Sequence, residues 1–132
     1  KIVELEKASK DNTGINFTIA LNYGSRDEMV RAMRHMADDL SSGNLSKDEI
    51  TEEVFNGYLD TKELPDPDLM IRTSGELRLS NYLLWQLAYT EFYFTDVPWP
   101  DFSKEELEKA IEQYNHRDRR YGGVEEEEEQ NV

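Results

Sequence analysis

The sequence predicts an α/β fold, with three βα units of a mostly parallel sheet flanked by helices. Two observations lead to this class. Short apolar stretches typical of strands alternate with longer stretches of helical periodicity. A serine followed three residues later by glutamate, which is the signature of a capping box, precedes three of the helical stretches: Ser25/Glu28, Ser46/Glu49 and Ser103/Glu106. Only three strands are recognised, so we expect the chain to form one half of a larger domain.

The first 60 residues predict a strand between helices. Residues 1–10 have the pattern of a helix end, and residues 15–23 predict a strand with alternating apolar side chains. A helix is predicted over residues 26–41, where apolar side chains recur at helical spacing. A further helix is predicted from Ser46 to about residue 59.

The central stretch, residues 64–100, predicts a buried strand, a turn, a helix and a second strand. An apolar run over 68–73 follows two prolines and predicts the first strand. Ser80 is the predicted N-cap of a helix over 81–89, which is apolar nearly all round. Residues 92–95 predict the next strand, and a last helix is predicted after Ser103.

Two arginines and a serine surround the predicted strand-to-helix turn. Arg72 ends the strand, Arg78 lies in the turn, and Ser80 opens the helix. A helix N-terminus offers free N–H groups and a partial positive charge, so these side chains predict a cradle for a phosphate or diphosphate. The pattern equally allows Arg72 to pair with Glu76 and Arg78 to be a solvated surface residue.

Composition limits the classes of function. The net charge of −14 argues against nonspecific nucleic-acid binding, although arginines can still cluster at a local anion site. The sequence has no cysteine and no apolar run of the roughly 20 residues that cross a bilayer. We therefore expect a cytoplasmic protein, with one domain over residues 1–124 and a disordered acidic tail over 125–132.

Three stretches resemble one family. The run DLMIRTSGELRLSNYLLWQLAYTEFYFTDVPWPDF from Asp68, LNYGSRDEM from Leu21 and RRYGG from Arg119 are similar to the C-terminal half of the cis-prenyltransferases, the undecaprenyl diphosphate synthase family. The resemblance covers about residues 2–123 and implies the C-terminal half of that fold.

The resemblance implies a transferase that condenses isopentenyl diphosphate with an allylic diphosphate and forms a cis double bond at each step. The family's pattern assigns the isopentenyl diphosphate to Arg72, Arg78 and Ser80. Leu79 would offer a backbone N–H, and Glu76 would orient an arginine. The resemblance also implies a homodimer, and it leaves open a transient membrane contact for product release.

Magnesium is the cofactor that the resemblance implies, with Glu91 as its ligand. Arg72 ends one predicted strand and Glu91 begins the next, so parallel pairing would place them at opposite ends of the sheet. Either the backbone bends back, or Glu91 serves a site in another subunit. Arg120 and Gly122 match an Arg-X-Gly motif that helps to bind the diphosphate of the other subunit.

The sequence departs from the family's pattern in one major respect. The Asp-Gly-Asn-Gly-Arg motif, whose aspartate is essential for the magnesium chemistry, does not occur in these 132 residues. We therefore assign no catalytic residue and expect the chain alone to be inactive. The alternative to an enzyme fragment is a noncatalytic partner subunit of a two-component cis-prenyltransferase.

Overall fold

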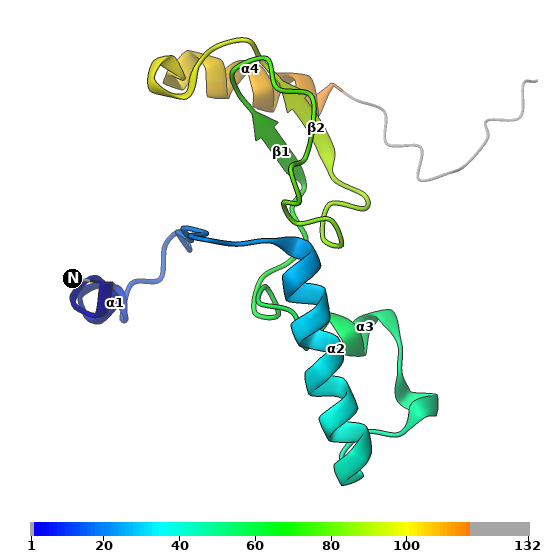
Figure 1. The fold of residues 1–132 in the computed structure, drawn as a ribbon. Coiled ribbons are helices and arrows are strands. Elements are labelled where there is room, and N and C mark those ends of the chain that lie inside the picture. The colour runs from blue at the N-terminus through cyan, green and yellow to red at the C-terminus, as the bar shows by residue number, and fades with distance from the viewer. Residues whose placement is uncertain (1, 117–132) are drawn as a thin grey trace, which may run out of the picture.

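The structure is a computed structural model that describes residues 2–116. The elements follow in the order α1 (Ile2–Ser9), α2 (Ser25–Ser42), a 3-10 helix (Lys47–Glu49), α3 (Glu52–Asn56), β1 (Leu69–Arg72), β2 (Glu91–Phe94), a second 3-10 helix (Trp99–Asp101) and α4 (Lys104–Asn115). Figure 1 shows α2 and α3 together in one part of the chain, and the two strands with α4 in another.

β1 and β2 form a parallel sheet, as the sequence predicts. The register pairs Leu69 with Glu91 and Arg72 with Phe94. Parallel neighbours need a long crossover, and residues 73–90 supply it. α4 packs on β2 and buries Ala110 completely. The α/β class, with a parallel sheet and flanking helices, is therefore confirmed.

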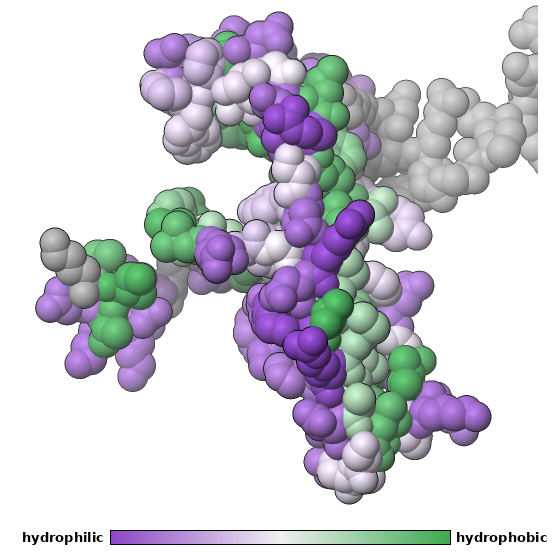
Figure 2. Space-filling view, viewed as in Figure 1, coloured by the Kyte–Doolittle hydropathy of each residue, from purple (hydrophilic) through white to green (hydrophobic). Residues whose placement is uncertain are grey.

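The strand predicted over residues 15–23 does not form among the described residues. This segment is not assigned to any strand, and Ile15, Phe17 and Ile19 are 96%, 85% and 66% exposed. A strand is stabilised by pairing and by burial of one face, and this segment has neither. Figure 2 shows hydrophobic side chains at the surface over α1 and the segment that follows it.

The helix predicted over residues 81–89 is also wrong, because this segment folds as a series of turns. Ser80, Asn81 and Leu83 have φ values of 50°, 62° and 44°, which a right-handed helix excludes. Hydrogen bonds to distant residues compete with helical ones here. The Leu84 N–H donates to the Ser25 hydroxyl at 3.0 Å, and the Trp85 indole donates to Asn56 at 2.6 Å.

The helix predicted from Ser46 to residue 59 is divided in two. The Ser46/Glu49 capping box forms, with the Ser46 N–H donating to the Glu49 carboxylate at 2.7 Å. Ile50 then adopts extended backbone, and Thr51 starts α3 by accepting from the Val54 N–H at 3.2 Å. Two capping residues so close together favour two short helices over one long helix.

The helix predicted over residues 26–41 is confirmed as α2. It ends at Ser42, and the next residue, Gly43, has a φ of 79°, the left-handed conformation typical of glycine after a helix. Its buried face includes Ala32 and Met36.

The other two predicted capping boxes do not form as expected. Gly24, not Ser25, is the N-cap of α2, and Glu28 is buried in other contacts. Ser103 is the N-cap of α4 but makes no capping hydrogen bond, while Glu106 pairs with Lys109. Within residues 2–116, no helix combines the length and hydrophobicity that a bilayer crossing requires.

Candidate anion-binding site

Arg72 and Ser80 meet at the carboxyl end of β1. The Arg72 guanidinium donates to the Ser80 hydroxyl, with 3.3 Å between Nη2 and Oγ. Arg72 is half-buried and Ser80 is exposed, so both are accessible from solvent. A guanidinium with further N–H donors beside a hydroxyl can bind a phosphate oxygen at this point.

Backbone N–H groups next to Arg72 are already used. The Ser74 N–H donates to the Val97 carbonyl at 3.0 Å, and the Gly75 N–H donates to the Thr95 carbonyl at 2.9 Å. These bonds join the loops that follow the two strands. No helix begins at Ser80, so the helix N-terminus that the sequence predicts at this site does not form, and the polar groups gathered here are mainly side chains.

Arg78 pairs with Glu76 in the same loop. The expected pairing of Glu76 with an arginine thus occurs with Arg78. The two side chains are 67% and 39% exposed, so water screens this pair strongly. Leu79 is half-buried, and its carbonyl accepts from the Tyr82 N–H at 3.1 Å.

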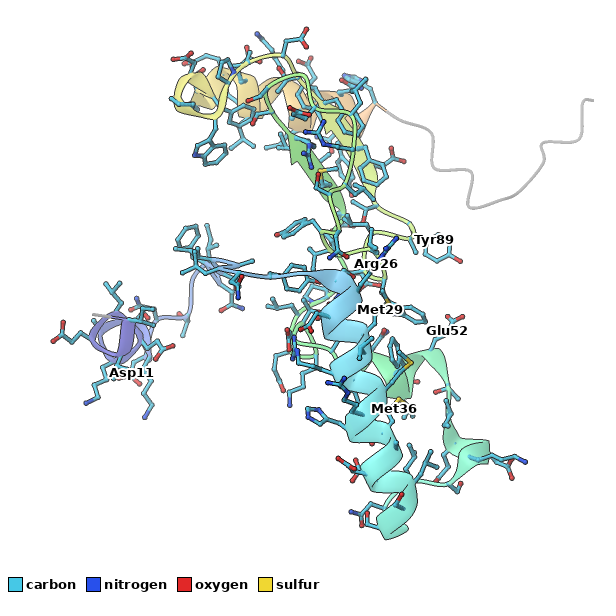
Figure 3. All side chains as sticks on the ribbon, in the orientation of Figure 1. Asp11, Arg26, Met29, Met36, Glu52 and Tyr89 are labelled. Carbon is cyan, nitrogen blue, oxygen red and sulfur yellow. The ribbon has the colours of Figure 1, made fainter. Side chains whose placement is uncertain are left out.

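The loop after Ser80 is bound to the first turn of α2. Asn81 accepts two hydrogen bonds there, from the Ser25 N–H to its carbonyl at 2.8 Å and from the Arg26 N–H to its Oδ1 at 2.9 Å. Figure 3 labels Arg26 at this end of α2 and Met36 farther along the helix. Asn81 was not among the predicted site residues, because the Ser25/Glu28 pattern predicts a local cap for this helix, whereas the N-cap is Gly24, which has no side chain.

A buried carboxylate lies beside this contact. Glu28 is 1% exposed and accepts from the Tyr23 hydroxyl at 2.5 Å and from the Asp60 N–H at 2.9 Å. The Gln86 amide also donates to it at 3.2 Å. Burial, together with the bond to Glu28, raises the pKa of Tyr23 to about 12. This network ties α2 to the loops on either side of β1.

Glu91 lies away from Arg72. It pairs with Leu69 at the start of the sheet, whereas Arg72 pairs with Phe94 at the end. Paired residues of parallel strands share a face and successive residues alternate, so Glu91 and Arg72 are on opposite faces. Among residues 2–116, no group of three or more histidine, cysteine, aspartate or glutamate residues is arranged to hold a metal ion.

The remaining predicted site residues, Arg120 and Gly122, lie outside the described residues, as does the predicted acidic tail over 125–132.

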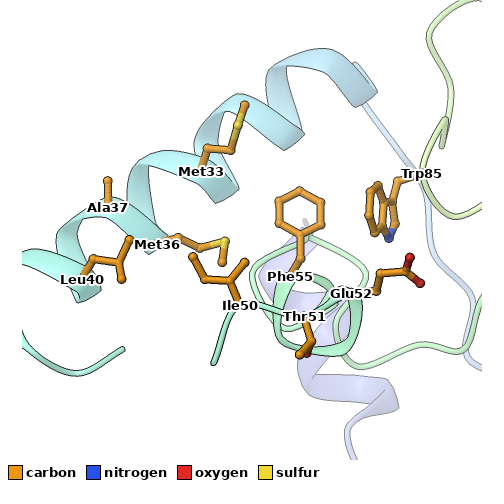
Figure 4. A pocket seen from close by; sticks show the side chains of 9 residues that line it. All are labelled: Met33, Met36, Ala37, Leu40, Ile50, Thr51, Glu52, Phe55 and Trp85. Carbon is orange, nitrogen blue, oxygen red and sulfur yellow. The ribbon is translucent and has the colours of Figure 1, made fainter. Parts of the chain in front are cut away.

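A separate pocket of about 660 Å³ lies between α2 and α3. Its lining is almost entirely apolar: Met33, Met36, Ala37, Leu40, Ile50, Thr51, Glu52, Phe55 and Trp85. Figure 4 shows the Phe55 and Trp85 rings side by side at one end. The two ring centroids are 4.7 Å apart. Glu52 is the one charged residue in this lining, so the pocket does not suit a diphosphate.

Comparisons with known proteins agree with one another. A family model described as putative undecaprenyl diphosphate synthase matches residues 1–122. The chain is 56% identical over 123 residues to an isoprenyl transferase of Bacillus cereus, covering 91% of this chain and 48% of that protein. It is 55% identical over 116 residues to an isoprenyl transferase of Clostridium perfringens, covering 88% and 46%. The chain thus spans about half the length of these curated relatives.

Two solved structures are similar in fold. The first is lavandulyl diphosphate synthase from Lavandula x intermedia in complex with dimethylallyl diphosphate, with a TM-score of 0.86 and 42% identity over 89% of this chain and 51% of that chain. The second is a probable undecaprenyl diphosphate synthase from Campylobacter jejuni, with a TM-score of 0.75 and 35% identity over 92% and 54%.

Proposed function

Because the chain belongs to the undecaprenyl diphosphate synthase family, we propose that it is part of an isoprenyl transferase. The reaction is the condensation of isopentenyl diphosphate with an allylic diphosphate to give a cis double bond. Within that enzyme, this chain binds the isopentenyl diphosphate and contributes to a dimer. The observation that carries the proposal is the contact between Arg72 and Ser80 at the carboxyl end of β1.

The cradle acts through charge and hydrogen bonding. Arg72 and Arg78 place two fixed positive charges near the diphosphate, and charge-assisted bonds to phosphate are about twice as strong as neutral ones. Ser80 accepts from Arg72 and still has its own O–H to donate to a phosphate oxygen. Glu76 orients Arg78 through their ion pair, and Leu79 offers a backbone N–H.

Magnesium enters the proposal through Glu91. A carboxylate oxygen suits Mg²⁺, which is commonly held by one or two carboxylates plus substrate phosphates. When bound, the ion neutralises diphosphate charge. Glu91 lies across the sheet from Arg72, so we assign it to the site of a neighbouring subunit. Arg120 and Gly122 are likewise assigned a supporting role at the partner's diphosphate.

The allylic diphosphate needs groups beyond the cradle. The family aspartate has no counterpart among these 132 residues, so no residue is assigned to ionisation of the allylic group, and the chain alone is expected to be inactive. The separation of Glu91 from Arg72 is also compatible with a second function, that of a noncatalytic partner subunit. The retained cradle residues favour the enzyme, because a pure partner has no need of them.

A binding measurement tests the cradle. In the full-length protein, Arg72→Ala should weaken isopentenyl diphosphate binding about tenfold to hundredfold, because a charge-assisted hydrogen bond contributes roughly 1.5–3 kcal/mol. Arg34→Ala is the matched control, since Arg34 is an exposed arginine in α2. Isothermal titration measures both. Equal affinities of Arg72→Ala and the wild type for isopentenyl diphosphate would reject the cradle. Glu91→Ala tests the metal assignment separately, and normal turnover by this variant would count against it.

A further inference from the structure

The first turn of α2 is capped by a residue that lies far away in the sequence. The N-cap is Gly24, which has no side chain, so the first N–H groups of the helix need acceptors from elsewhere. Asn81 supplies two of them: its carbonyl accepts from the Ser25 N–H at 2.8 Å, and its Oδ1 accepts from the Arg26 N–H at 2.9 Å. One residue thus does the work of an N-cap side chain.

The residue types at this contact fit its geometry. Asn81 has a φ of 62°, and asparagine is one of the few residues other than glycine that tolerate the left-handed region. A Cβ at Gly24 would lie 2.9 Å from Asn81 Nδ2, so a larger residue there would force this carboxamide to shift. Glycine at position 24 therefore leaves room for the Asn81 carboxamide where it lies.

The contact also fixes Ser80, which precedes Asn81 in the chain. Ser80 has a φ of 50°, an unfavourable conformation for serine that persists only where the surroundings impose it. Its hydroxyl accepts from Arg72 at 3.3 Å. The two bonds made by Asn81 hold the backbone immediately after Ser80, so they determine where this hydroxyl lies.

We propose that Asn81 is a positioning residue for the diphosphate site, acting through Ser80 without contacting the ligand itself. By capping α2 it holds Ser80 where the hydroxyl can meet both Arg72 and a phosphate oxygen. This inference rests on the proposed function, because it takes Arg72 and Ser80 to be diphosphate-binding groups. It adds a role for α2, whose first turn becomes the fixed support of the cradle.

A double-mutant cycle in the full-length protein tests the inference. Asn81→Gly keeps the left-handed backbone and the main-chain carbonyl but loses the Oδ1 acceptor, so the variant should fold. We expect it to weaken isopentenyl diphosphate binding between about threefold and tenfold, the usual effect of one hydrogen bond. In a Ser80→Ala background, Asn81→Gly should leave the affinity for isopentenyl diphosphate nearly unchanged, because the hydroxyl that Asn81 positions is gone.

Ser25→Ala is the matched control for a merely structural role. It removes the bond from the Leu84 N–H to the Ser25 hydroxyl, which also joins α2 to this loop but lies beyond Asn81. Both Ser25→Ala and Asn81→Gly should lower the melting temperature by a few degrees. Only Asn81→Gly should change the affinity for isopentenyl diphosphate.

The outcomes separate this inference from the proposed function. Wild-type affinity in Asn81→Gly, or an equal loss in the Ser80→Ala background, overturns the role of Asn81 while Arg72→Ala still weakens binding. Unchanged affinity in both Arg72→Ala and Ser80→Ala instead overturns the cradle, and the inference with it.

Discussion

Glu91 and Arg72 lie on adjacent parallel strands but at opposite ends and on opposite faces of the sheet. Glu91 pairs with Leu69 at one end, and Arg72 pairs with Phe94 at the other. With about 3.3 Å per residue, three positions along the strands separate them by roughly 10 Å before the change of face is counted. The two groups that the proposed reaction assigns to diphosphate and to magnesium are therefore not neighbours within one chain.

Subunit complementation tests whether they meet between chains. A heterodimer of an Arg72→Ala subunit with a Glu91→Ala subunit, purified through two different tags, should recover about half the wild-type activity. In a symmetric dimer with sites shared between chains, one of the two sites then keeps both residues. Each mutant homodimer should have little activity.

The matched heterodimer combines Arg72→Ala with Arg78→Ala. Both changes affect the same cradle, so it should recover no activity. If the first heterodimer is as inactive as the second, Glu91 acts with its own chain's Arg72, and the backbone around the sheet must rearrange.

The ion pair between Glu76 and Arg78 predicts that Glu76→Gln changes the affinity for isopentenyl diphosphate in opposite directions with and without Arg78. In the wild type, Glu76→Gln should weaken isopentenyl diphosphate binding slightly, by less than about 1 kcal/mol, because the exposed pair contributes little beyond orientation. In an Arg78→Ala background, Glu76→Gln should instead improve binding, since an unpaired carboxylate repels the diphosphate. Titration calorimetry on the four proteins gives the coupling; independent, additive effects would show that Glu76 does not act through Arg78.

Local sequence patterns predict those parts of the fold that depend on local interactions. The helix over 26–41 and the two strands that form the sheet have clear periodicity, and each forms within one or two residues of its expected bounds. The predicted helix over 81–89 fails because its backbone and side chains bond to α2 and α3, and periodicity contains no information about those partners.

The sequence predicts only the part of the candidate site that depends on residues close together in the chain. Arg72 and Ser80 were predicted to lie together, and they do. A helix starting at Ser80 was expected, whereas the residue after Ser80, Asn81, accepts from the Arg26 N–H in the first turn of α2, 55 positions away in the sequence. The sequence does not reveal this capping interaction, because Ser25 and Glu28 have the pattern of a local capping box, although Gly24 is the N-cap in the structure.

Tyr23 predicts a pH dependence of stability. Burial and the bond to Glu28 raise its pKa to about 12, against about 10 in an unfolded chain. The folded state binds this proton more tightly, so the stabilisation is complete below pH 10 and is lost as the pH rises to about 12. The free energy of unfolding of the full-length protein should therefore fall more steeply over this range than that of Tyr23→Phe. Parallel curves in urea denaturation at pH 9 to 12 would exclude this linkage.

The exposed segment over residues 15–21 predicts self-association of the 132-residue chain. Its alternating apolar side chains are 66–96% exposed at Ile15, Phe17, Ile19 and Leu21. A segment with the alternating pattern of a strand and no strand partner can pair with another chain, and lysine on a strand edge opposes such pairing. We expect the chain to associate at micromolar concentration, and Phe17→Lys with Ile19→Lys to shift it towards the mass of one chain.

A matched double variant distinguishes strand pairing from nonspecific hydrophobic association. Val3 and Leu5 are 61% and 70% exposed but lie in α1, so Val3→Lys with Leu5→Lys removes a similar apolar surface without a strand pattern. Each double variant adds two positive charges to the net charge of −14, so their effects on charge are equal. Light scattering measures the mass, and infrared spectra measure intermolecular β structure. Association that survives Phe17→Lys with Ile19→Lys but disappears with the α1 variant would assign the contact to α1.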